Sequence, residues 1–163
     1  MKNSKWFKYL LIVGIVILCV TFDQVSKVIA INNLVEYKSV PVINNFFYWT
    51  LCYNTGGAWS IFSDSTWLLV IISLIALGFI IYTLIKSKSI LYDIAASVFT
   101  GGLIGNLIDR VVNSKVTDFL DFKIFGYDFP VFNVADMFIV ISAVLIMVVV
   151  LKEETKDGTK DSK

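Results

Sequence analysis

Two aspartates, Asp118 and Asp136, are the residues whose types and surroundings best suit catalysis. Asp118 lies in a segment that is otherwise aromatic and β-branched, and Asp136 follows Asn133 by three residues at the start of an apolar run. Capping by Asn133 and the helix dipole would favour an acid at Asp136 by about 0.3–1 kcal/mol, but they do not explain Asp118. Two carboxyls that meet at a partly dehydrated site share a proton, so that one acts as base and the other as acid toward water.

The composition removes most other routes to hydrolysis. The 163 residues include no histidine, which excludes a Ser-His-Asp triad, a Cys-His pair and a histidine-ligated metal site. The two cysteines, Cys19 and Cys52, have no spacing typical of a metal site or a disulfide, and we expect both to be inert. We therefore predict no metal and no cofactor, although a Ser-Lys arrangement around Lys27 is conceivable.

Further polar residues lie at the ends of apolar runs, where ionisable groups are costly and usually kept for a purpose. Asp23 and Lys27 are four residues apart and share a helix face, either as a self-neutralising pair or as contacts to substrate. Asn106 and Arg110 share a face in the same way. Arg110 is the only arginine beside thirteen lysines, which favours a need for a planar, multidentate guanidinium over a chance cation at the interface.

Four apolar runs must position these residues, at about 9–30, 67–85, 91–108 and 134–151. The last three are long enough to cross roughly 30 Å of hydrocarbon as helices. With 57% hydrophobic and 17% charged residues, the chain has the composition of a membrane protein. A net charge of +1 gives no reason to expect nucleic acid as a partner. We predict an all-α membrane protein with four transmembrane helices.

Small residues mark the third run as a packing surface. Gly101 and Gly105 form a G-x-x-x-G, and Ser97 lies one turn earlier. Residues of this size allow a neighbouring helix to approach closely, so a structural role accounts for them.

The basic residues set the predicted orientation, because cytoplasmic connections carry the excess of lysine and arginine. With the N-terminus inside, nine lysines lie in the cytoplasm close to helix ends, against five basic residues in the longer outer connections. We expect both termini inside, one membrane domain over 1–151, and a charged, disordered cytoplasmic tail over 152–163.

The two outer connections, about 31–66 and 109–133, are rich in aromatic and β-branched residues, as strands are. Residues 121–125 and 129–132 flank a Gly126-Tyr127-Asp128 segment and could pair as a hairpin. We therefore expect a small β-rich subdomain on the outer face. The alternative is an amphipathic surface loop that is held at the interface by its aromatic side chains.

The residues alone leave three functions open. An aspartyl hydrolase would use the two carboxyls on water, and a proton-coupled carrier or channel would use them as a relay. A membrane partner protein without activity would need neither.

Four segments together resemble the lipoprotein signal peptidase family, signal peptidase II. They occur in the family's order and extend over nearly the whole chain apart from the C-terminal tail. The segments are Asp23–Lys27 (DQVSK), Asn54–Ser60 (NTGGAWS), Gly101–Arg110 with Val116–Asp118 (GGLIGNLIDR and VTD), and Phe132–Asp136 (FNVAD). The departures are slight: Trp59 stands where many relatives have phenylalanine, and Gly57 where alanine is common.

The resemblance implies an aspartyl endopeptidase of the bacterial cytoplasmic (inner) membrane, with its active site at the extracytoplasmic interface. Its substrate would be a prolipoprotein with diacylglycerol on the lipobox cysteine, cut just before that cysteine. Asp118 and Asp136 match the catalytic dyad, and no acyl-enzyme is expected. The segment 54–62 would close over the site or act as an interfacial anchor. The residues that match the family's supporting and substrate-binding positions are Asp23, Lys27, Asn54, Gly56, Asn106, Arg110 and Asn133.

The partners implied are the prolipoprotein, as signal-peptide helix and lipid, and membrane lipid. We expect no nucleic acid and a monomeric protein.

Overall fold

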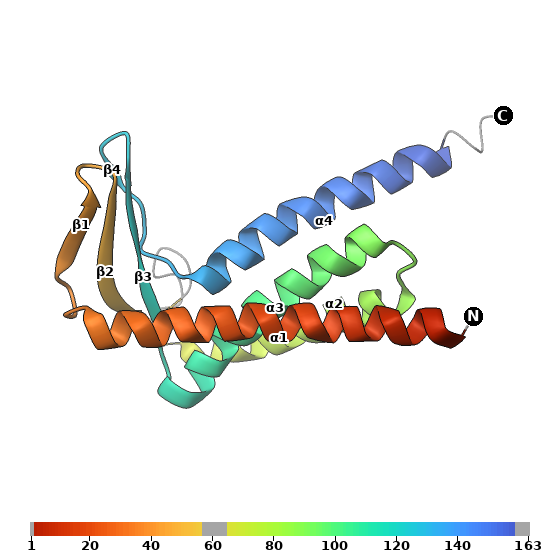
Figure 1. The fold of residues 1–163 in the computed structure, drawn as a ribbon, viewed down its shortest axis with the longest axis horizontal. Coiled ribbons are helices and arrows are strands. Elements are labelled where there is room, and N and C mark those ends of the chain that lie inside the picture. Colours follow the sequence, from red (N-terminus) through yellow and green to blue (C-terminus); the bar gives the residue numbers. More distant parts are fainter. Residues whose placement is uncertain (1, 57–64, 159–163) are drawn as a thin grey trace.

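Four long helices and one small antiparallel sheet make up the computed structural model, which describes residues 2–56 and 65–158 (Figure 1). The sheet stands at one end of the helices, and both termini lie at the other end. The predicted fold class is confirmed. In chain order the elements are α1 (Lys2–Asn33), β1 (Ser39–Ile43), β2 (Phe47–Asn54), α2 (Thr66–Lys86), α3 (Ile90–Asn113), β3 (Val116–Ile124), β4 (Tyr127–Asp128) and α4 (Val134–Gly158).

All four helices are long and apolar enough to cross a membrane, over Trp6–Asn33, Thr66–Lys86, Ile90–Asn113 and Val134–Glu153. The fourth helix continues beyond the predicted apolar run and ends at Gly158. Neither glycine nor proline interrupts α4 before Gly158, and its lysines and glutamates are good helix formers.

Helix α3 is the centre of the bundle and packs against each of the other three helices. Its buried face is built mainly from small residues, among them Ala95, Ala96, Ser97, Thr100 and Gly101. Lipid tails are as apolar as leucine, so helices in a membrane associate through close packing, and small residues permit it.

Three glycines of α3 mark where the neighbouring helices come closest. A Cβ on Gly101 would lie 2.5 Å from the Cβ of Cys19 in α1, and one on Gly102 would lie 2.6 Å from the carbonyl oxygen of Ala135 in α4. A Cβ on Gly105 would lie 2.5 Å from Oδ2 of Asp23. The expected packing role of the G-x-x-x-G is confirmed, and Gly102 extends it to a second helix.

The sheet has the strand order β1-β2-β3-β4, with antiparallel neighbours. The register of β2 and β3 places Trp49 opposite Leu120 and Cys52 opposite Asp118, so β2 carries one extra residue, as in a bulge. The sheet confirms the expected β-rich subdomain over the alternative of an irregular surface loop.

The second hairpin turns earlier than predicted. Phe125 and Gly126 have φ values of 51° and 81°, and Ile124 pairs with Tyr127 across them. Positive φ at both central residues is typical of a tight two-residue hairpin turn. The returning strand is therefore Tyr127–Asp128, and Phe132 meets Leu120 only through an isolated bridge.

An aromatic cluster fixes the sheet to the C-terminal end of α1. Phe122 stacks on Phe47 and on Phe132, with ring centroids 4.6 and 5.6 Å apart. The same cluster includes Phe119, Leu120 and Ala30 of α1. The strand that carries Asp118 is thereby held against the helices.

The close approach at Gly101 leads to a stability prediction. Gly101→Ala should lower the free energy of unfolding by about 1–3 kcal/mol, because its methyl group overlaps Cys19. Gly78→Ala in α2 is the matched control: no atom lies within 4 Å of its added Cβ, and alanine favours a helix over glycine by about 1 kcal/mol. Thermal unfolding in detergent would measure both variants, and equal melting temperatures would contradict the packing described.

Candidate active site

The two aspartates, Asp118 of β3 and Asp136 of the first turn of α4, line one cavity of about 500 Å³. A single buried residue, Asn133, joins them. Its Nδ2 donates to Oδ1 of Asp118 at 2.6 Å, and its backbone N–H donates to Oδ2 of Asp136 at 3.2 Å. The sequence separates the carboxyls by eighteen positions, and the fold brings both to the same asparagine. We refer to this space as the dyad cavity.

Asn133 is also the N-cap of α4, as the sequence predicted. The backbone N–H of Asp136 donates to Oδ1 of Asn133 at 3.0 Å, while Asp136 accepts from the backbone of Asn133. This reciprocal pair has the geometry of a capping box. The orientation of Asp136 is thus set by the start of its own helix.

Asn106 supports Asp136 from α3. Its Nδ2 donates to Oδ1 of Asp136 at 2.7 Å, and its Oδ1 accepts from Lys27 Nζ and from Asn133 Nδ2, each at 3.1 Å. Because Lys27 can only donate, the oxygen of the Asn106 amide must face it. The amide nitrogen is therefore left to bond Asp136, which fixes this donor on the carboxylate.

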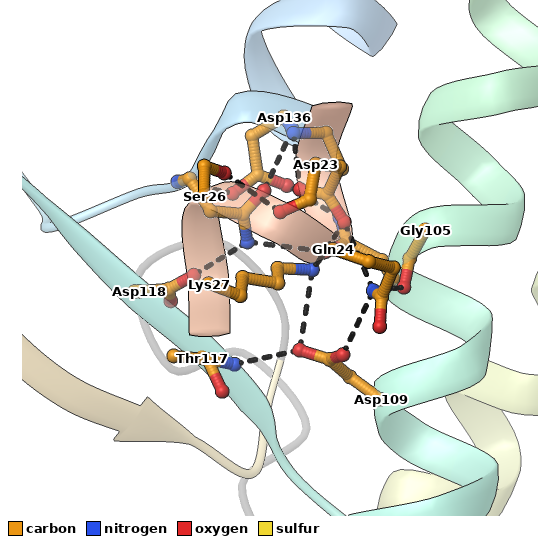
Figure 2. A network of polar contacts seen from close by, with 12 residues as sticks. Asp23, Gln24, Ser26, Lys27, Gly105, Asp109, Thr117, Asp118 and Asp136 are labelled. Atoms are coloured by element: carbon orange, nitrogen blue, oxygen red, sulfur yellow. Dashed lines mark hydrogen bonds and ion pairs between the residues drawn. The ribbon is translucent and has the colours of Figure 1, made fainter. Parts of the chain in front are cut away.

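Lys27 lies close to the dyad, in a buried ionic cluster that we define as Asp23, Gln24, Lys27 and Asp109 (Figure 2). Its ammonium lies 2.8 Å from Oδ2 of Asp23 and 3.2 Å from Oδ2 of Asp109. With the bond to Asn106, all three ammonium hydrogens are used. The predicted Asp23–Lys27 pairing is confirmed, and neither residue lines the dyad cavity.

Asp23 also reaches the start of α4. Its Oδ1 accepts from the backbone N–H of Ala135 at 2.9 Å. The first N–H groups of a helix have no acceptor within that helix, and a carboxylate is favoured beside them by the helix dipole. Asp23 therefore holds the N-terminus of α4 against α1.

Sequence reasoning missed two members of the cluster, Gln24 and Asp109. Gln24 Nε2 donates to Oδ1 of Asp109 at 3.1 Å, and Oδ2 of Asp109 accepts from the backbone N–H of Thr117 at 3.0 Å. Asp109 thus joins α3 to the strand that carries Asp118. Asp109 lies three residues after Asn106 on the same helix face, and this spacing could have predicted that it belongs to the site.

The remaining predicted residues form the outer part of the site. Asn54 and Arg110 line the dyad cavity, and the side chain of Asn54 bonds Asp118. Gly56 links the two, because its N–H donates to Oδ1 of Asn54 at 2.9 Å and its carbonyl accepts from Arg110 at 3.5 Å. Gly57, Trp59 and most of the proposed closing segment lie outside the described residues.

Electrostatics favour a protonated Asp118. Burial, followed by the charge of Asp136, raises the pKa of Asp118 to about 7, against smaller lowering effects of Asn133, Asn54 and Lys27. A carboxyl with this pKa keeps its proton in much of the population near neutral pH. Burial also raises the pKa of the neighbouring Cys52 thiol to about 12, which makes a thiolate nucleophile there unfavourable.

The rest of the dyad cavity is apolar. Its walls include Met137, Val140 and Ile141 of α4 and the segment Phe129–Phe132. Among the described residues, no group of three or more His, Cys, Asp or Glu side chains could hold a metal ion. The site therefore combines a small polar end, where two carboxyls can act on water, with room for an apolar ligand.

Comparisons with known proteins agree with this geometry. The model of the family described as Signal peptidase (SPase) II matches residues 15–152. The chain is 38% identical over 151 residues to a lipoprotein signal peptidase of Staphylococcus aureus strain MRSA252, covering 91% of this chain and 93% of that protein. The corresponding protein of strain Newman is 37% identical with the same coverage.

Two solved structures are also similar. One is described as a bacterial membrane enzyme determined by the in meso method at 2.3 Å resolution; it has a TM-score of 0.83 and 37% identity, and the match covers 89% of this chain and 90% of that one. A second, at 1.9 Å resolution, has a TM-score of 0.79 and 38% identity, with 86% and 92% covered. Sequence and fold agree along the chain, which therefore belongs to the signal peptidase II family of membrane proteases.

Proposed function

We propose that this protein removes the signal peptide from diacylglyceryl-modified prolipoproteins and cuts just before the lipidated cysteine, with Asp118 and Asp136 as its catalytic dyad. The observation that carries the proposal is the placement of both carboxyls on one buried asparagine at the polar end of an apolar cavity. Membership of the signal peptidase II family and the lipoprotein signal peptidases among its relatives support the choice of substrate.

The shape of the site suits a lipid-modified peptide. Acyl chains are favoured against the apolar wall of the dyad cavity, while the scissile peptide group needs the polar end. The dyad lies where α4 begins beside the sheet, so a peptide bond at the end of a membrane-spanning signal helix would arrive at this depth. Water can reach the bond there without crossing the hydrocarbon.

In the proposed mechanism Asp136 is the base and Asp118 the acid. Asp136 lies in the first turn of α4, where the helix dipole favours a carboxylate, and it accepts hydrogen bonds from the Asn133 backbone and the Asn106 amide. Asp136 takes a proton from water as the water oxygen attacks the scissile carbonyl carbon. Protonated Asp118 donates to the carbonyl oxygen, and a proton then passes to the leaving amine as the C–N bond breaks. The products are a carboxylate on the signal peptide and a free amine on the cysteine.

The supporting residues have separate roles in this proposal. Arg110, half-buried in the cavity wall, holds the substrate backbone or the charge that develops on it. Asn106 and Asn133 hold the dyad in place, and Lys27 supplies a buried positive charge next to Asn106. Asn54 and Gly56 close the outer rim next to Arg110.

We further propose that the protein acts as a monomer in the bacterial cytoplasmic membrane, with both termini inside and the sheet at the extracytoplasmic surface. The two termini lie at the same end of four membrane-spanning helices, which supports a common side for both. The excess of lysine at that end favours the cytoplasm.

The dyad predicts a large loss of activity on conservative substitution. Asp118→Asn and Asp136→Asn keep the side-chain volume but remove proton transfer, so each should lower kcat by about 10²–10⁴-fold on a diacylglyceryl-modified prolipoprotein. Glu153→Gln, an exposed acid at the other end of α4, is the matched control and should cut at the wild-type rate.

A folded dyad variant with normal cleavage would refute this mechanism. Proton or solute flux in proteoliposomes without a peptide product would instead support the carrier alternative. A wild-type protein with neither cleavage nor flux, and dyad variants that behave like it, would favour a partner protein.

The pKa of Asp118 sets a pH dependence. The acid must hold its proton, so kcat/KM should fall as the pH rises through about 7, where Asp118 becomes ionised. The bond from Asn54 lowers this pKa, so Asn54→Ala should move the descending limb to higher pH. Cleavage rates between pH 5 and 9 would measure the descending limb in the wild type and in Asn54→Ala. Melting temperatures at each pH are the control. A rate that keeps increasing to pH 9 would argue against Asp118 as the acid.

The orientation can be tested by thiol labelling in intact cells. In a Cys52→Ala background, an impermeant reagent should label Ser114→Cys, after α3, and spare Ser87→Cys, after α2. Permeabilised cells provide the control, since Ser87→Cys should then react. The reverse pattern would place both termini outside.

A further inference from the structure

A second cavity, of about 480 Å³, lies on the sheet beside the dyad cavity. The two share Phe129, Pro130 and Val131, so they adjoin along this short segment. The dyad cavity is polar only at one end, whereas charged or hydroxyl-bearing side chains line most of the second cavity. We call it the sheet pocket; its lining residues outside the shared segment are Ser39, Tyr48, Asp121, Lys123 and Asp128.

The sheet pocket lies on the face of β3 opposite to the dyad. Successive side chains of a strand point to opposite faces, which separates Asp118 from Asp121 and Lys123. Thr50 donates to Oδ2 of Asp121 at 2.6 Å and lies 2.8 Å from the hydroxyl of Ser39, so this face is polar across three strands. A bound peptide that extends from Asp118 past the shared segment would reach Asp121 and Lys123.

Several groups of the pocket have unused hydrogen-bonding capacity within the described part of the chain. Thr50 donates to Oδ2 of Asp121, and no described residue donates to Oδ1. Lys123 pairs with Asp128 at 3.1 Å, which leaves two of its ammonium hydrogens. The backbone N–H of Val131 also has no acceptor among the described residues, while Pro130 has no N–H at all.

These groups are those that an extended peptide requires. Each residue of a peptide presents one N–H donor and one C=O acceptor, so its binding site needs both kinds of partner. An acyl chain would make no hydrogen bond with the charged and hydroxyl-bearing side chains that line most of the pocket, so it is disfavoured there. An anionic lipid headgroup is also disfavoured, because two carboxylates, Asp121 and Asp128, outnumber the single ammonium of Lys123.

We propose that the sheet pocket binds the first residues of the mature lipoprotein, the polar segment that follows the lipidated cysteine. This inference rests on the proposed function, in which the signal peptide and acyl chains occupy the dyad cavity and the membrane. The mature segment is the one part of the substrate that must leave the bilayer. The pocket is on the sheet, which stands at the end of the helices away from both termini (Figure 1).

The test compares two synthetic substrates with the same signal peptide and diacylglyceryl cysteine. One ends at that cysteine as an amide, and the other continues with a run of polar residues. The readout is the ratio of kcat/KM for the long substrate to that for the short one. The wild type should prefer the long substrate by about threefold to tenfold, mainly through KM, as expected for one or two hydrogen bonds.

Lys123→Met and Asp121→Asn should each bring this ratio close to one, because each removes a charged partner of the mature segment. In the Asp121→Asn variant the amide oxygen could still accept from Thr50, so the strand pairing is kept. Lys38→Met is the matched control: this exposed lysine next to β1 does not line the pocket, and its ratio should equal that of the wild type.

The outcomes separate this inference from the proposed function. A wild type that cuts both substrates with equal kcat/KM, or variants that keep the wild-type ratio, would overturn the inference alone. Variants that lose both substrates equally also keep that ratio and count against it. A wild type that cuts neither substrate would overturn the proposed function and this inference with it.

Discussion

The structure of the site depends on one buried cation, the ammonium of Lys27, and on the groups that compensate it. An ammonium removed from water costs several kcal/mol unless its hydrogens are all bonded and its charge is balanced. Here two carboxylates and one amide oxygen do both, at 2.8–3.2 Å. Each carboxylate also accepts a backbone hydrogen bond from another element: Asp23 from the first turn of α4, and Asp109 from the start of β3.

The dyad follows from this arrangement. Asp118 lies on β3 and Asp136 on α4, and the ionic cluster holds these two elements together. Asn106 and Asn133 then fix the two carboxyls by hydrogen bonds. Truncation of Asp23 or Asp109 would still leave Lys27 one carboxylate, but it would deprive one ammonium hydrogen and one buried backbone N–H of their acceptor, at a cost of about 1–3 kcal/mol for each group. Loss of activity in such a variant would therefore reflect a displaced dyad as well as lost charge.

Much of this was predictable from the sequence, because the relevant signals are local. Apolar runs predicted the spans, spacing of three and four residues placed Asn106 with Arg110 and Asn133 with Asp136, and aromatic, β-branched segments predicted the sheet. Asp109 was missed because its partners, Lys27 and the backbone of Thr117, come from other elements. The hairpin turn was misplaced because Phe125, a poor candidate for positive φ, adopts it beside Gly126.

The dyad cavity is built from two kinds of residue that differ in how freely they can change. Its apolar wall on α4, including Val140 and Ile141, can exchange for side chains of similar volume at little cost. Its polar end cannot, because Asn133 and Asp136 also form the start of the helix. An inhibitor held chiefly by the wall is therefore open to resistance by single substitutions. One held by the dyad and its asparagines leaves the protein few substitutions that evade the drug and still preserve the fold.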